Sequence, residues 1–212
     1  MTKAKICGLS TPEAVEAALA GGASYLGFVF YEASPRYVTP ALAAQLAAPA
    51  RGRAKIVALM VDPPWPLVDA VVTALDPDLV QLHGDEKPYR ISEVSRQSGR
   101  AIVKALPVAT AADIRDAEAY DGLVEHLMFD ARPPKDSDLP GGNGVAFDWT
   151  LLSGVKFQRP YFLAGGLDPW NVEEAIRLSG APMVDVSSGV ERGPGLKDPA
   201  LITQFLDAVR RA

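Results

Sequence analysis

The sequence is poor in the residues that build disulfides and metal sites. Among 212 residues it has one cysteine, Cys7, and two histidines, His83 and His126. A single thiol cannot form an intramolecular disulfide, and these three residues cannot complete a tetrahedral zinc site. A Mg²⁺ site built from carboxylates stays open on this count, but no clustered pattern of Asp and Glu suggests one. A free cysteine is usually buried packing, so Cys7 alone leaves packing and chemistry both open.

The chain also lacks an excess of basic charge and any long apolar run. It carries 21 Lys and Arg against 26 Asp and Glu, a net charge of −5, and shows no Lys/Arg cluster of the kind that binds nucleic acid. No apolar stretch approaches the ~18 residues of a membrane span, and the N-terminus has no signal-peptide core. With one cysteine and no export signal, we expect a cytoplasmic protein that binds neither nucleic acid nor membrane.

Eight short apolar runs alternate with helical patterns along a chain that is 48% hydrophobic. The runs are continuous rather than alternating, which is typical of parallel strands buried on both faces. They cover residues 4–7, 25–30, 55–61, 79–82, 101–105, 126–130, 161–164 and 183–187. Eight βα units at intervals of ~20–30 residues predict an α/β fold, a single (β/α)₈ TIM barrel over residues 1–212. A doubly wound open sheet is the main alternative, and it usually has fewer strands for this length.

Several helix starts share one pattern, a side-chain oxygen followed by proline. The oxygen can cap a free backbone N–H, and proline suits the first helical position. The pattern occurs at Thr11-Pro12, Thr39-Pro40, Asp168-Pro169 and Asp198-Pro199, so we predict a helix from each of these prolines. Glycines after two of the helices predict their ends. The connection over residues 131–159 is long and begins with many prolines and glycines, which predicts an active-site loop.

Polar residues gather where the predicted strands end. In a (β/α)₈ barrel the active site lies at the C-terminal ends of the strands and in the loops that follow. The candidates at these ends are Cys7, Arg36, Gln81, His83, Asp130 and Asp185. A thiolate is a good base when its pKa is lowered, and an Asp in a dry site can keep a proton to donate. His126 falls early in its strand, and we assign it no function.

Glycines and serines after the last strands predict a phosphate site. Gly165 and Gly166 follow the seventh run, and Ser187, Ser188 and Gly189 follow the eighth. Bare backbone N–H groups at this place in a barrel can hold an anion without a lysine. A third set, Gly142 and Gly144, belongs to the stretch 141–144 of the long loop. Any one pair could equally serve a turn, but their combination favours phosphate.

Each candidate side chain also has a plain structural interpretation. Asp130 could cap a turn, Arg36 could pair with Glu32 on the surface, and His83 could be a satisfied structural histidine. Asp185 lies inside a barrel strand, where an unpaired carboxylate is costly. That cost favours contact with a ligand or with a neighbouring donor.

The chain resembles the phosphoribosylanthranilate isomerases, barrel enzymes of tryptophan biosynthesis. The matching stretches, in the family's order, are 5–8 (KICG), 27–30 (GFVF) with 34–36 (SPR), 80–84 (VQLHG), 141–144 (GGNG) with 147–149 (FDW), 163–167 (LAGGL) with 171–172 (NV), and 184–191 (VDVSSGVE) with 195 and 197–198. Each is weak alone, and their combination is highly specific. One departure is Asn143, which stands where the family usually has threonine.

The resemblance implies an Amadori rearrangement, the conversion of N-(5-phosphoribosyl)anthranilate to 1-(2-carboxyphenylamino)-1-deoxyribulose 5-phosphate. It implies that Asp130 is the general acid and Cys7 the general base. It implies that Arg36 holds the anthranilate carboxylate, and it places Asp185 near the sugar, with Gln81 and His83 lining the site. The substrate's nitrogen is the electron sink, so the resemblance implies no metal and no other cofactor. The phosphosugar substrate is the expected partner, and both a monomer and a homodimer are consistent with the sequence.

Two alternatives remain at this stage. Another phosphosugar barrel enzyme would need metal-binding histidines and carboxylates, or catalytic lysines, at its strand ends, and Lys104 is only one such lysine. A non-catalytic phosphosugar-binding barrel would be favoured by the loss of Cys7 or Asp130, and both residues are present.

Overall fold

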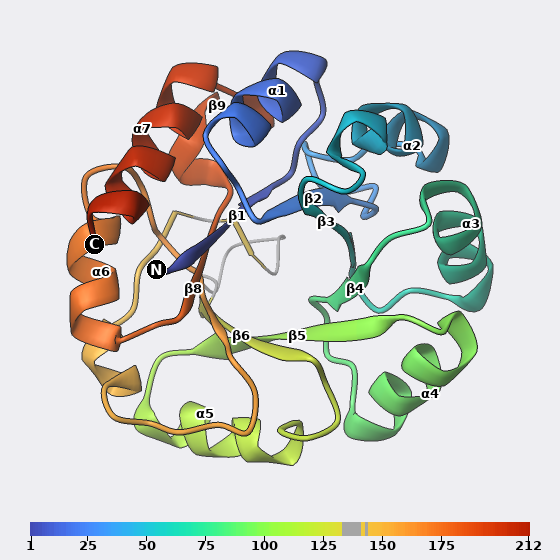
Figure 1. Cartoon of the computed structure of the whole chain (residues 1–212). Coiled ribbons are helices and arrows are strands. Elements are labelled where there is room, and N and C mark those ends of the chain that lie inside the picture. The colour runs from blue at the N-terminus through green and yellow to red at the C-terminus, as the bar shows by residue number, and fades with distance from the viewer. Residues whose placement is uncertain (133–140, 143) are drawn as a thin grey trace.

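Parallel strands form a closed ring in the computed structural model, which describes residues 1–132, 141–142 and 144–212. The ring runs in sequence order from β1 to β8, and β8 pairs with β1 to close it. Figure 1 shows the ring along its axis, with the helices outside it. The strands are β1 (Lys3–Cys7), β2 (Tyr25–Val29), β3 (Lys55–Met60), β4 (Leu79–Leu82), β5 (Ala101–Val108), β6 (His126–Ala131), β7 (Phe162–Leu163) and β8 (Met183–Val186). The predicted (β/α)₈ barrel is therefore confirmed, and the open sheet is wrong.

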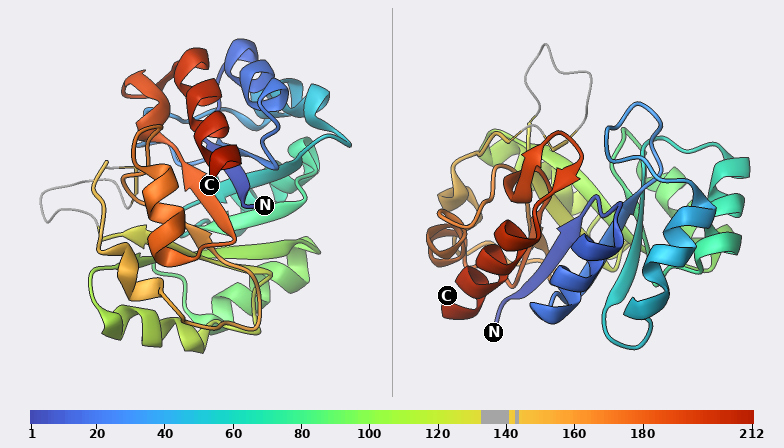
Figure 2. Two further views of the ribbon diagram at one scale, coloured as in Figure 1. Left: turned by 60° about the vertical axis from the view of Figure 1, so that its left-hand side comes forward. Right: turned by 90° about the horizontal axis from the view of Figure 1, so that it is seen from above.

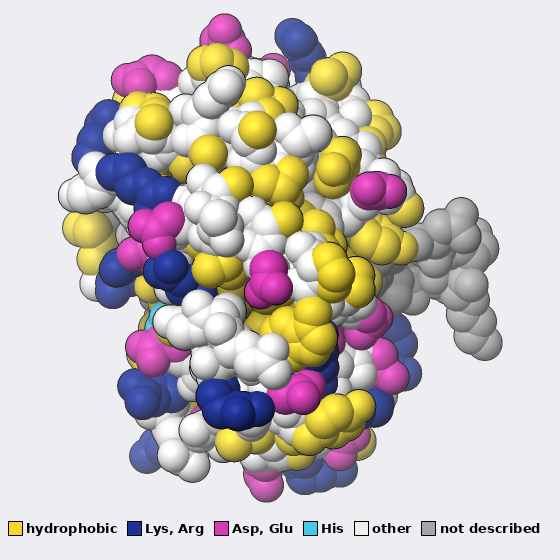
Figure 3. Space-filling view, turned by 90° about the vertical axis from the view of Figure 1, so that its right-hand side faces the viewer, with side chains coloured by type: hydrophobic (Ala, Val, Ile, Leu, Met, Phe, Trp, Pro, Cys, Tyr) yellow, Lys and Arg dark blue, Asp and Glu magenta, His cyan; other side chains and the backbone are white. Residues whose placement is uncertain are grey.

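The helices cover the outer face of the ring, and α7 packs against both α1 and α6. They are α1 (Pro12–Ala20), α2 (Pro40–Ala47), α3 (Trp65–Leu75), α4 (Pro88–Ser98), α5 (Ala111–Asp116), α6 (Val172–Ser179) and α7 (Pro199–Arg211). The two termini lie near one another in both views of Figure 2. On the face that Figure 3 shows, basic and acidic side chains are interspersed.

Helix starts follow the predicted pattern in three places. Thr11, Thr39 and Asp198 each accept a backbone N–H at the N-cap, with proline next in the chain. The fourth start, at Pro169, is wrong, because α6 begins at Val172. Asp168 and Asn171 explain the delay. Asp168 Oδ1 accepts the N–H groups of Trp170 and Asn171, while Asn171 Oδ1 accepts the N–H of Asp168. This closed turn occupies the residues that would form the first helical turn.

Short elements complete the fold. A 3₁₀ turn, η3 (Trp149–Leu152), lies between β6 and β7, and three further 3₁₀ turns are η1 (Ala48–Ala50), η2 (Ala117–Ala119) and η4 (Ser188–Val190). After β8 an antiparallel pair, β9 (Glu191–Gly193) and β10 (Leu196–Lys197), forms a small hairpin. Most of the long loop predicted at the start of the 131–159 connection lies outside the described residues, as does Asn143.

Two apolar layers pack against the strands of the barrel, one on each face. The larger layer packs the helices against the outer face of the strands, and the smaller one fills the barrel interior. The interior residues are Tyr25, Val57, Leu79, Val103, Ala105, Met128, Phe162, Ala164 and Met183. Successive strand residues alternate between the two faces, so Lys5 and Cys7 both point inward from β1. The interior above the apolar plug, at the C-terminal ends of the strands, is therefore free to hold polar groups.

Candidate active site

A cavity of about 800 Å³, part of it open to solvent, lies at the C-terminal ends of the strands. Its polar lining comes from all round the barrel: Cys7, Ser34, Arg36, His83, Asp130, Asp185, Ser187 and Ser188. Backbone of glycines completes the wall, with Gly141, Gly142, Gly144, Gly165 and Gly166. Residues as far apart in the chain as Cys7 and Ser187, which are separated by 180 positions, thus border one space.

Cys7 ends β1 and lines this cavity with only 3% of its surface exposed. Burial raises the pKa of its thiol above the usual value, because a thiolate loses solvation in the barrel interior. The nearby Lys5 ammonium opposes this rise, the Asp185 carboxylate adds to it, and Lys197 opposes it more weakly. The balance between burial and these charges decides how much thiolate the site holds.

Lys5 and Asp185 form an ion pair inside the barrel. Lys5 Nζ donates to Asp185 Oδ1 at 2.8 Å, and the two residues are paired across β1 and β8. Burial alone would lower the pKa of Lys5, but Asp185 and Cys7 outweigh it and raise that pKa. The ammonium therefore keeps its proton at neutral pH. Lys5 is thus the neighbouring donor that a carboxylate buried in a barrel strand requires.

Asp130 contacts His83, which follows β4, and His83 in turn contacts Gln81 on β4. Its Oδ1 accepts the N–H of Ala131 at 2.8 Å, and its Oδ2 lies 3.1 Å from His83 Nε2. The other ring nitrogen, Nδ1, is 3.1 Å from Gln81 Nε2. Because an amide nitrogen only donates, Nδ1 accepts and Nε2 carries the proton that points at Asp130. In this arrangement Gln81 Oε1 has no partner among the described residues.

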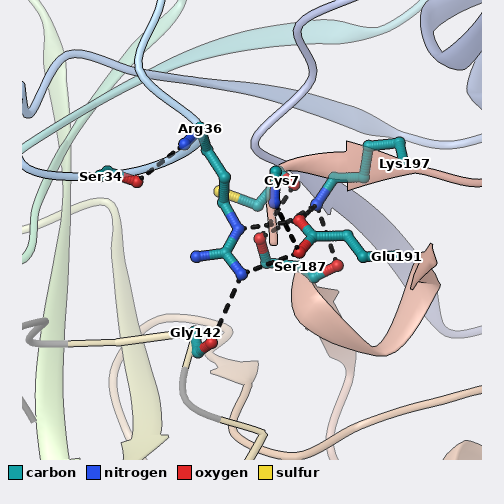
Figure 4. A network of polar contacts seen from close by, with 8 residues as sticks. Cys7, Ser34, Arg36, Gly142, Ser187, Glu191 and Lys197 are labelled. Atoms are coloured by element: carbon teal, nitrogen blue, oxygen red, sulfur yellow. Dashed lines mark hydrogen bonds and ion pairs between the residues drawn. The ribbon is translucent and has the colours of Figure 1, made fainter. Parts of the chain in front are cut away.

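Arg36 is held by a carboxylate from the hairpin after β8. Its Nε and Nη2 donate to Oε1 and Oε2 of Glu191 at 2.8 and 3.0 Å, and Nη2 also reaches the carbonyl oxygen of Gly142 at 3.4 Å. Lys197 binds the same Glu191 at 2.5 Å. Figure 4 shows the Glu191 carboxylate between the two cations. Burial would raise the pKa of Glu191, but Arg36 and Lys197 outweigh it and lower that pKa.

Ser187 connects this group to Cys7. Its hydroxyl donates to the carbonyl oxygen of Cys7 at 3.2 Å. Lys197 Nζ in turn donates to the carbonyl oxygen and to the hydroxyl of Ser187 at 2.9 and 3.2 Å. With its bond to Glu191, Lys197 thus has a partner for each of its three hydrogens. The end of β8 and the strand that carries the thiol are therefore fixed relative to one another.

Several glycines are required by close approaches at this site. Gly165 and Gly166 have φ of +85° and +65°, and a Cβ on either would lie 2.4 or 2.6 Å from a backbone nitrogen. Two positions with φ in this left-handed range are costly for any residue with a side chain. Their backbones consequently border the cavity without side chains in between.

The comparisons agree with this geometry. Residues 4–208 match the model of the family described as N-(5'phosphoribosyl)anthranilate (PRA) isomerase. The N-(5'-phosphoribosyl)anthranilate isomerase of Caulobacter sp. (strain K31) is 61% identical over 212 residues, covering all of both chains. The chain belongs to the phosphoribosylanthranilate isomerase family.

Solved structures of the family share the architecture. The phosphoribosyl anthranilate isomerase of Thermotoga maritima superimposes with a TM-score of 0.89 at 30% identity, over all of both chains. A phosphoribosyl anthranilate isomerase in complex with reduced 1-(o-carboxyphenylamino)-1-deoxyribulose 5-phosphate superimposes with a TM-score of 0.85 at 29% identity, again over both whole chains. The predicted phosphoribosylanthranilate isomerase family and fold are both confirmed.

Most of the predicted site residues lie together in this family member. Of the predicted set, the cavity is lined by Cys7, Arg36, His83, Asp130, Asp185, Gly142, Gly144, Gly165, Gly166, Ser187 and Ser188. Gln81 is different, because it is fully buried and lies beneath His83 rather than in the lining. Gly189 also stays out of the lining, since its backbone packs against Leu167, where a Cβ would lie 1.9 Å from the carbonyl oxygen.

The structure shows the surroundings of Arg36 and His126. Arg36 pairs with Glu191 and not with Glu32. His126 lies at the start of β6, and its Nδ1 contacts the carbonyl oxygen of Pro160 at 2.9 Å, away from the cavity as predicted. Among the residues that the structure describes, no group of three or more His, Cys, Asp and Glu could hold a metal ion. None of the described helices is long and apolar enough to cross a membrane.

Sequence reasoning gave no role to three charged residues of this phosphoribosylanthranilate isomerase site. Lys5, Glu191 and Lys197 each belong to a stretch that resembles the family, but their pairing needs the folded barrel. A signal existed for Lys5 alone. A lysine two residues before a cysteine on one strand lies on the same face as the cysteine, so the sequence already indicated a positive charge beside the thiol. Glu191 and Lys197 sit on a hairpin whose short strands have no apolar pattern.

Proposed function

We propose that this chain converts N-(5-phosphoribosyl)anthranilate to 1-(2-carboxyphenylamino)-1-deoxyribulose 5-phosphate, with Cys7 as general base and Asp130 as general acid. The reaction is an aldose–ketose isomerisation in tryptophan biosynthesis. The observation that carries the assignment is the shared lining of one cavity by a buried thiol and a carboxyl group in a member of this family.

The first step opens the sugar ring. Asp130 gives a proton to the furanose ring oxygen, and the bond between C1 and that oxygen breaks as the nitrogen lone pair forms an iminium. Asp130 is placed for this task because its carboxyl group lines the cavity, with one oxygen fixed by the N–H of Ala131. A positioned acid of this kind accelerates such a step by about 10²–10⁴-fold.

The second step moves the double bond along the sugar. The Cys7 thiolate takes the proton from C2, and the C–H electrons flow toward the iminium nitrogen to give an enolamine. Tautomerisation of the enolamine then gives the ketone. The substrate's nitrogen takes up the electrons, so these steps call for no metal and no other cofactor. The thiol lies on the β1 side of the cavity, with Asp130 on β6.

Arg36 is proposed to bind the anthranilate carboxylate. Glu191 occupies its Nε and one Nη2 hydrogen, which leaves Nη1 for a ligand. Guanidinium groups match planar carboxylates well. His83 and Asp185 border the space next to the acid and the base, and we assign them to the sugar, with Gln81 holding the His83 ring from below.

The 5-phosphate is proposed to lie against the glycines and serines that follow β6, β7 and β8. Gly142, Gly144, Gly165 and Gly166 border the cavity with backbone alone, and Ser187 and Ser188 add hydroxyl groups. Such a surface of N–H and O–H donors binds a phosphate without a lysine. Gly189 contributes by letting the turn after β8 pack tightly on Leu167.

We extend the proposal to the molecule's setting. A single barrel domain over residues 1–212 is supported by the pairing of β8 with β1, and a cytoplasmic location by the single thiol and the biosynthetic reaction. Light scattering of the purified protein distinguishes the monomer from the homodimer.

A fluorescence assay tests the reaction. Freshly formed phosphoribosylanthranilate is mixed with purified protein without added metal, and the loss of anthranilate-type fluorescence is followed. We expect turnover that depends on protein concentration and a product with the mass of the substrate. Binding of a non-reactive product analogue without any turnover would instead identify a non-catalytic phosphosugar-binding barrel.

A further inference from the structure

Lys5 is a charged side chain fully enclosed in the barrel interior, on the same face of β1 as Cys7. A Cβ added to Gly27 on the neighbouring strand would lie 3.0 Å from Cys7 Sγ and 3.1 Å from Lys5 Nζ. The sulfur and the ammonium therefore border the same small space, which only a glycine on β2 leaves free. Lys5 Nζ uses one hydrogen for Asp185, and an ammonium has three.

The charges that face Cys7 come from several elements. Lys5 on β1 and Lys197 on β10 favour the thiolate, while Asp185 on β8 disfavours it. Arg36 after β2, Asp130 on β6 and His83 after β4 line the same cavity. The ion pairs in this region join Lys5 to Asp185, and both Arg36 and Lys197 to Glu191. Of these three cations, Lys5 is the one whose ammonium borders the same small space as the sulfur.

We propose that Lys5 is a positioning residue for the reaction, whose buried ammonium offsets part of the cost of burying the Cys7 thiolate and so makes the sulfur, which borders the cavity, available as a base. The inference rests on the proposed role of Cys7 as general base. Asp185 then has a task besides contact with the sugar, because it keeps the Lys5 ammonium in place and charged.

Lys5 suits this task better than Lys197. All three hydrogens of Lys197 are taken by Glu191 and Ser187, and burial lowers its pKa. The pKa of Lys5 is raised, so its charge persists at neutral pH. The effect of Lys5 on the thiol is second only to that of burial itself. Charges that interact across a dry site are weakly screened, so the removal of this one should be measurable.

The thiol can be titrated without any activity measurement. Cys7 is the only cysteine in the sequence, so thiolate ultraviolet absorbance and alkylation by iodoacetamide report this one sulfur, with the Cys7→Ser protein as blank. For Lys5→Met we expect alkylation at neutral pH to be at least about tenfold slower than in the wild type, which corresponds to a rise of about one in the thiol pKa. Lys5→Arg keeps the charge and should titrate close to the wild type.

A second pair of variants covers the case in which Lys5→Met fails to fold because Asp185 is left unpaired. Asp185→Asn removes a negative charge near the sulfur and should lower the thiol pKa. Adding Lys5→Met to Asp185→Asn leaves no unpaired buried charge, and we expect it to raise the thiol pKa relative to Asp185→Asn alone. The difference between these two proteins isolates the contribution of Lys5.

Lys104→Met is the matched control. Lys104 is also buried in a barrel strand and paired with a carboxylate, Glu86, at 2.6 Å. It lies between Val103 and Ala105, which face the interior, so it points to the outer face, away from the thiol. We expect its removal to leave the thiol titration unchanged, since the two sites share no contact.

The outcomes separate this inference from the proposed reaction. A thiol titration that is unchanged by Lys5→Met in both backgrounds, or shifted equally by Lys104→Met, overturns the role of Lys5. In the supporting case, kcat/KM of Lys5→Met falls at neutral pH and recovers at high pH, whereas a purely structural defect would lower it at every pH. Full turnover by Cys7→Ser would instead refute the base role of the thiol, even with the titration shifted as expected.

Discussion

Cys7 and Asp130 face one cavity, but their neighbours prepare them for opposite tasks. The thiol is surrounded by buried strands, which raise its pKa, and it has cations beside it, which lower that pKa. The carboxyl group has one oxygen fixed by a backbone N–H and the other held by a histidine ring. Pairs of titratable groups in contrasting surroundings are the usual arrangement for acid–base catalysis.

Replacement of the thiol tests the base. A serine hydroxyl is far less acidic than a thiol, so Cys7→Ser should lower kcat by about 10²–10⁴-fold and leave KM within a few-fold. Steady-state kinetics by the fluorescence assay measures both constants. Because the sulfur acts on the transition state, an effect on KM alone would contradict the assignment.

Replacement of the carboxyl group tests the acid. Asp130→Asn keeps the shape and can still accept the N–H of Ala131, but an amide has no acidic proton to give. We expect kcat to fall by about 10²–10⁴-fold. His83→Gln provides the comparison, because it removes the ring at Asp130 Oδ2 while leaving the acid in place. A kcat for Asp130→Asn close to that of the wild type would move the acid elsewhere.

Arg36 and its carboxylate test substrate binding. Arg36→Ala should raise KM strongly with a smaller change in kcat, since it removes an interaction that is present before the reaction begins. Glu191→Gln keeps Arg36 but loosens the fork that orients it, so we expect a smaller rise in KM. Titration with anthranilate-containing ligands checks both. If Arg36→Ala left KM unchanged, the guanidinium would have to be structural.

At the scale of elements, one buried ion pair joins the loops after β3 and β4 to the middle of β5. Glu86 accepts the N–H groups of Asp62 and Gly84, which follow β3 and β4, and binds Lys104 of β5 at 2.6 Å. Lys104 also donates to the carbonyl oxygen of Gly84. This lysine therefore fastens a loop on the outside of the barrel, and it does not line the cavity.

Breaking that pair should destabilise the barrel. Lys104→Met leaves the Glu86 carboxylate buried without its cation, and removal of one partner of a buried pair costs about 3–5 kcal/mol. The free energy of unfolding in urea measures the loss. Combining Lys104→Met with Glu86→Leu removes the unpaired charge, so part of the stability should return. A loss in the single variant no larger than that of an exposed pair would show that the pair is not important for the fold.

The strands were predictable because their signal is local, and the irregular elements were not. All eight predicted runs overlap a strand of the ring, since continuous apolar segments have few other places to be buried. The start of α6 was misplaced because the Asp168–Asn171 turn uses the same residue types as a helix cap. The hairpin β9–β10 gave no signal, because only two or three residues pair on each side.

At the scale of the whole molecule, ring closure turns separate strand ends into one site. The sequence predicts which residues end the strands, and in a (β/α)₈ barrel all of those ends lie at one face. That reasoning places Cys7, Asp130 and Asp185 in one cavity. It cannot give the partners of a charged side chain, because Arg36–Glu191 and Lys5–Asp185 join residues 155 and 180 positions apart. Such pairings depend on register and side-chain packing, which no local pattern encodes.

The charges that build the site also affect the stability of the molecule in acid. Several carboxylates have a folded pKa below the usual value. They include Glu191, held by Arg36 and Lys197, and Asp113, which accepts the N–H groups of Ala109 and Thr110, in each case against the opposing effect of burial. A carboxylate with a lowered folded pKa binds fewer protons in the folded state than in the unfolded one. Its stabilisation is therefore complete above the unfolded pKa of about 4.3 and is lost as the pH falls through the folded value.

Glu191→Gln tests this acid sensitivity. Near pH 7 the variant leaves Arg36 and Lys197 without their carboxylate, and we expect it to be less stable than the wild type by about 3–5 kcal/mol. As the pH falls below about 4.3 the wild type loses the same interaction, so the two free energies of unfolding should converge. Urea unfolding at a series of pH values measures both curves. Glu174→Gln is the control, because its exposed pair with Arg177 is worth only about 0–1 kcal/mol. A gap between Glu191→Gln and the wild type that stayed constant down to low pH would mean that packing, and not charge, explains the loss.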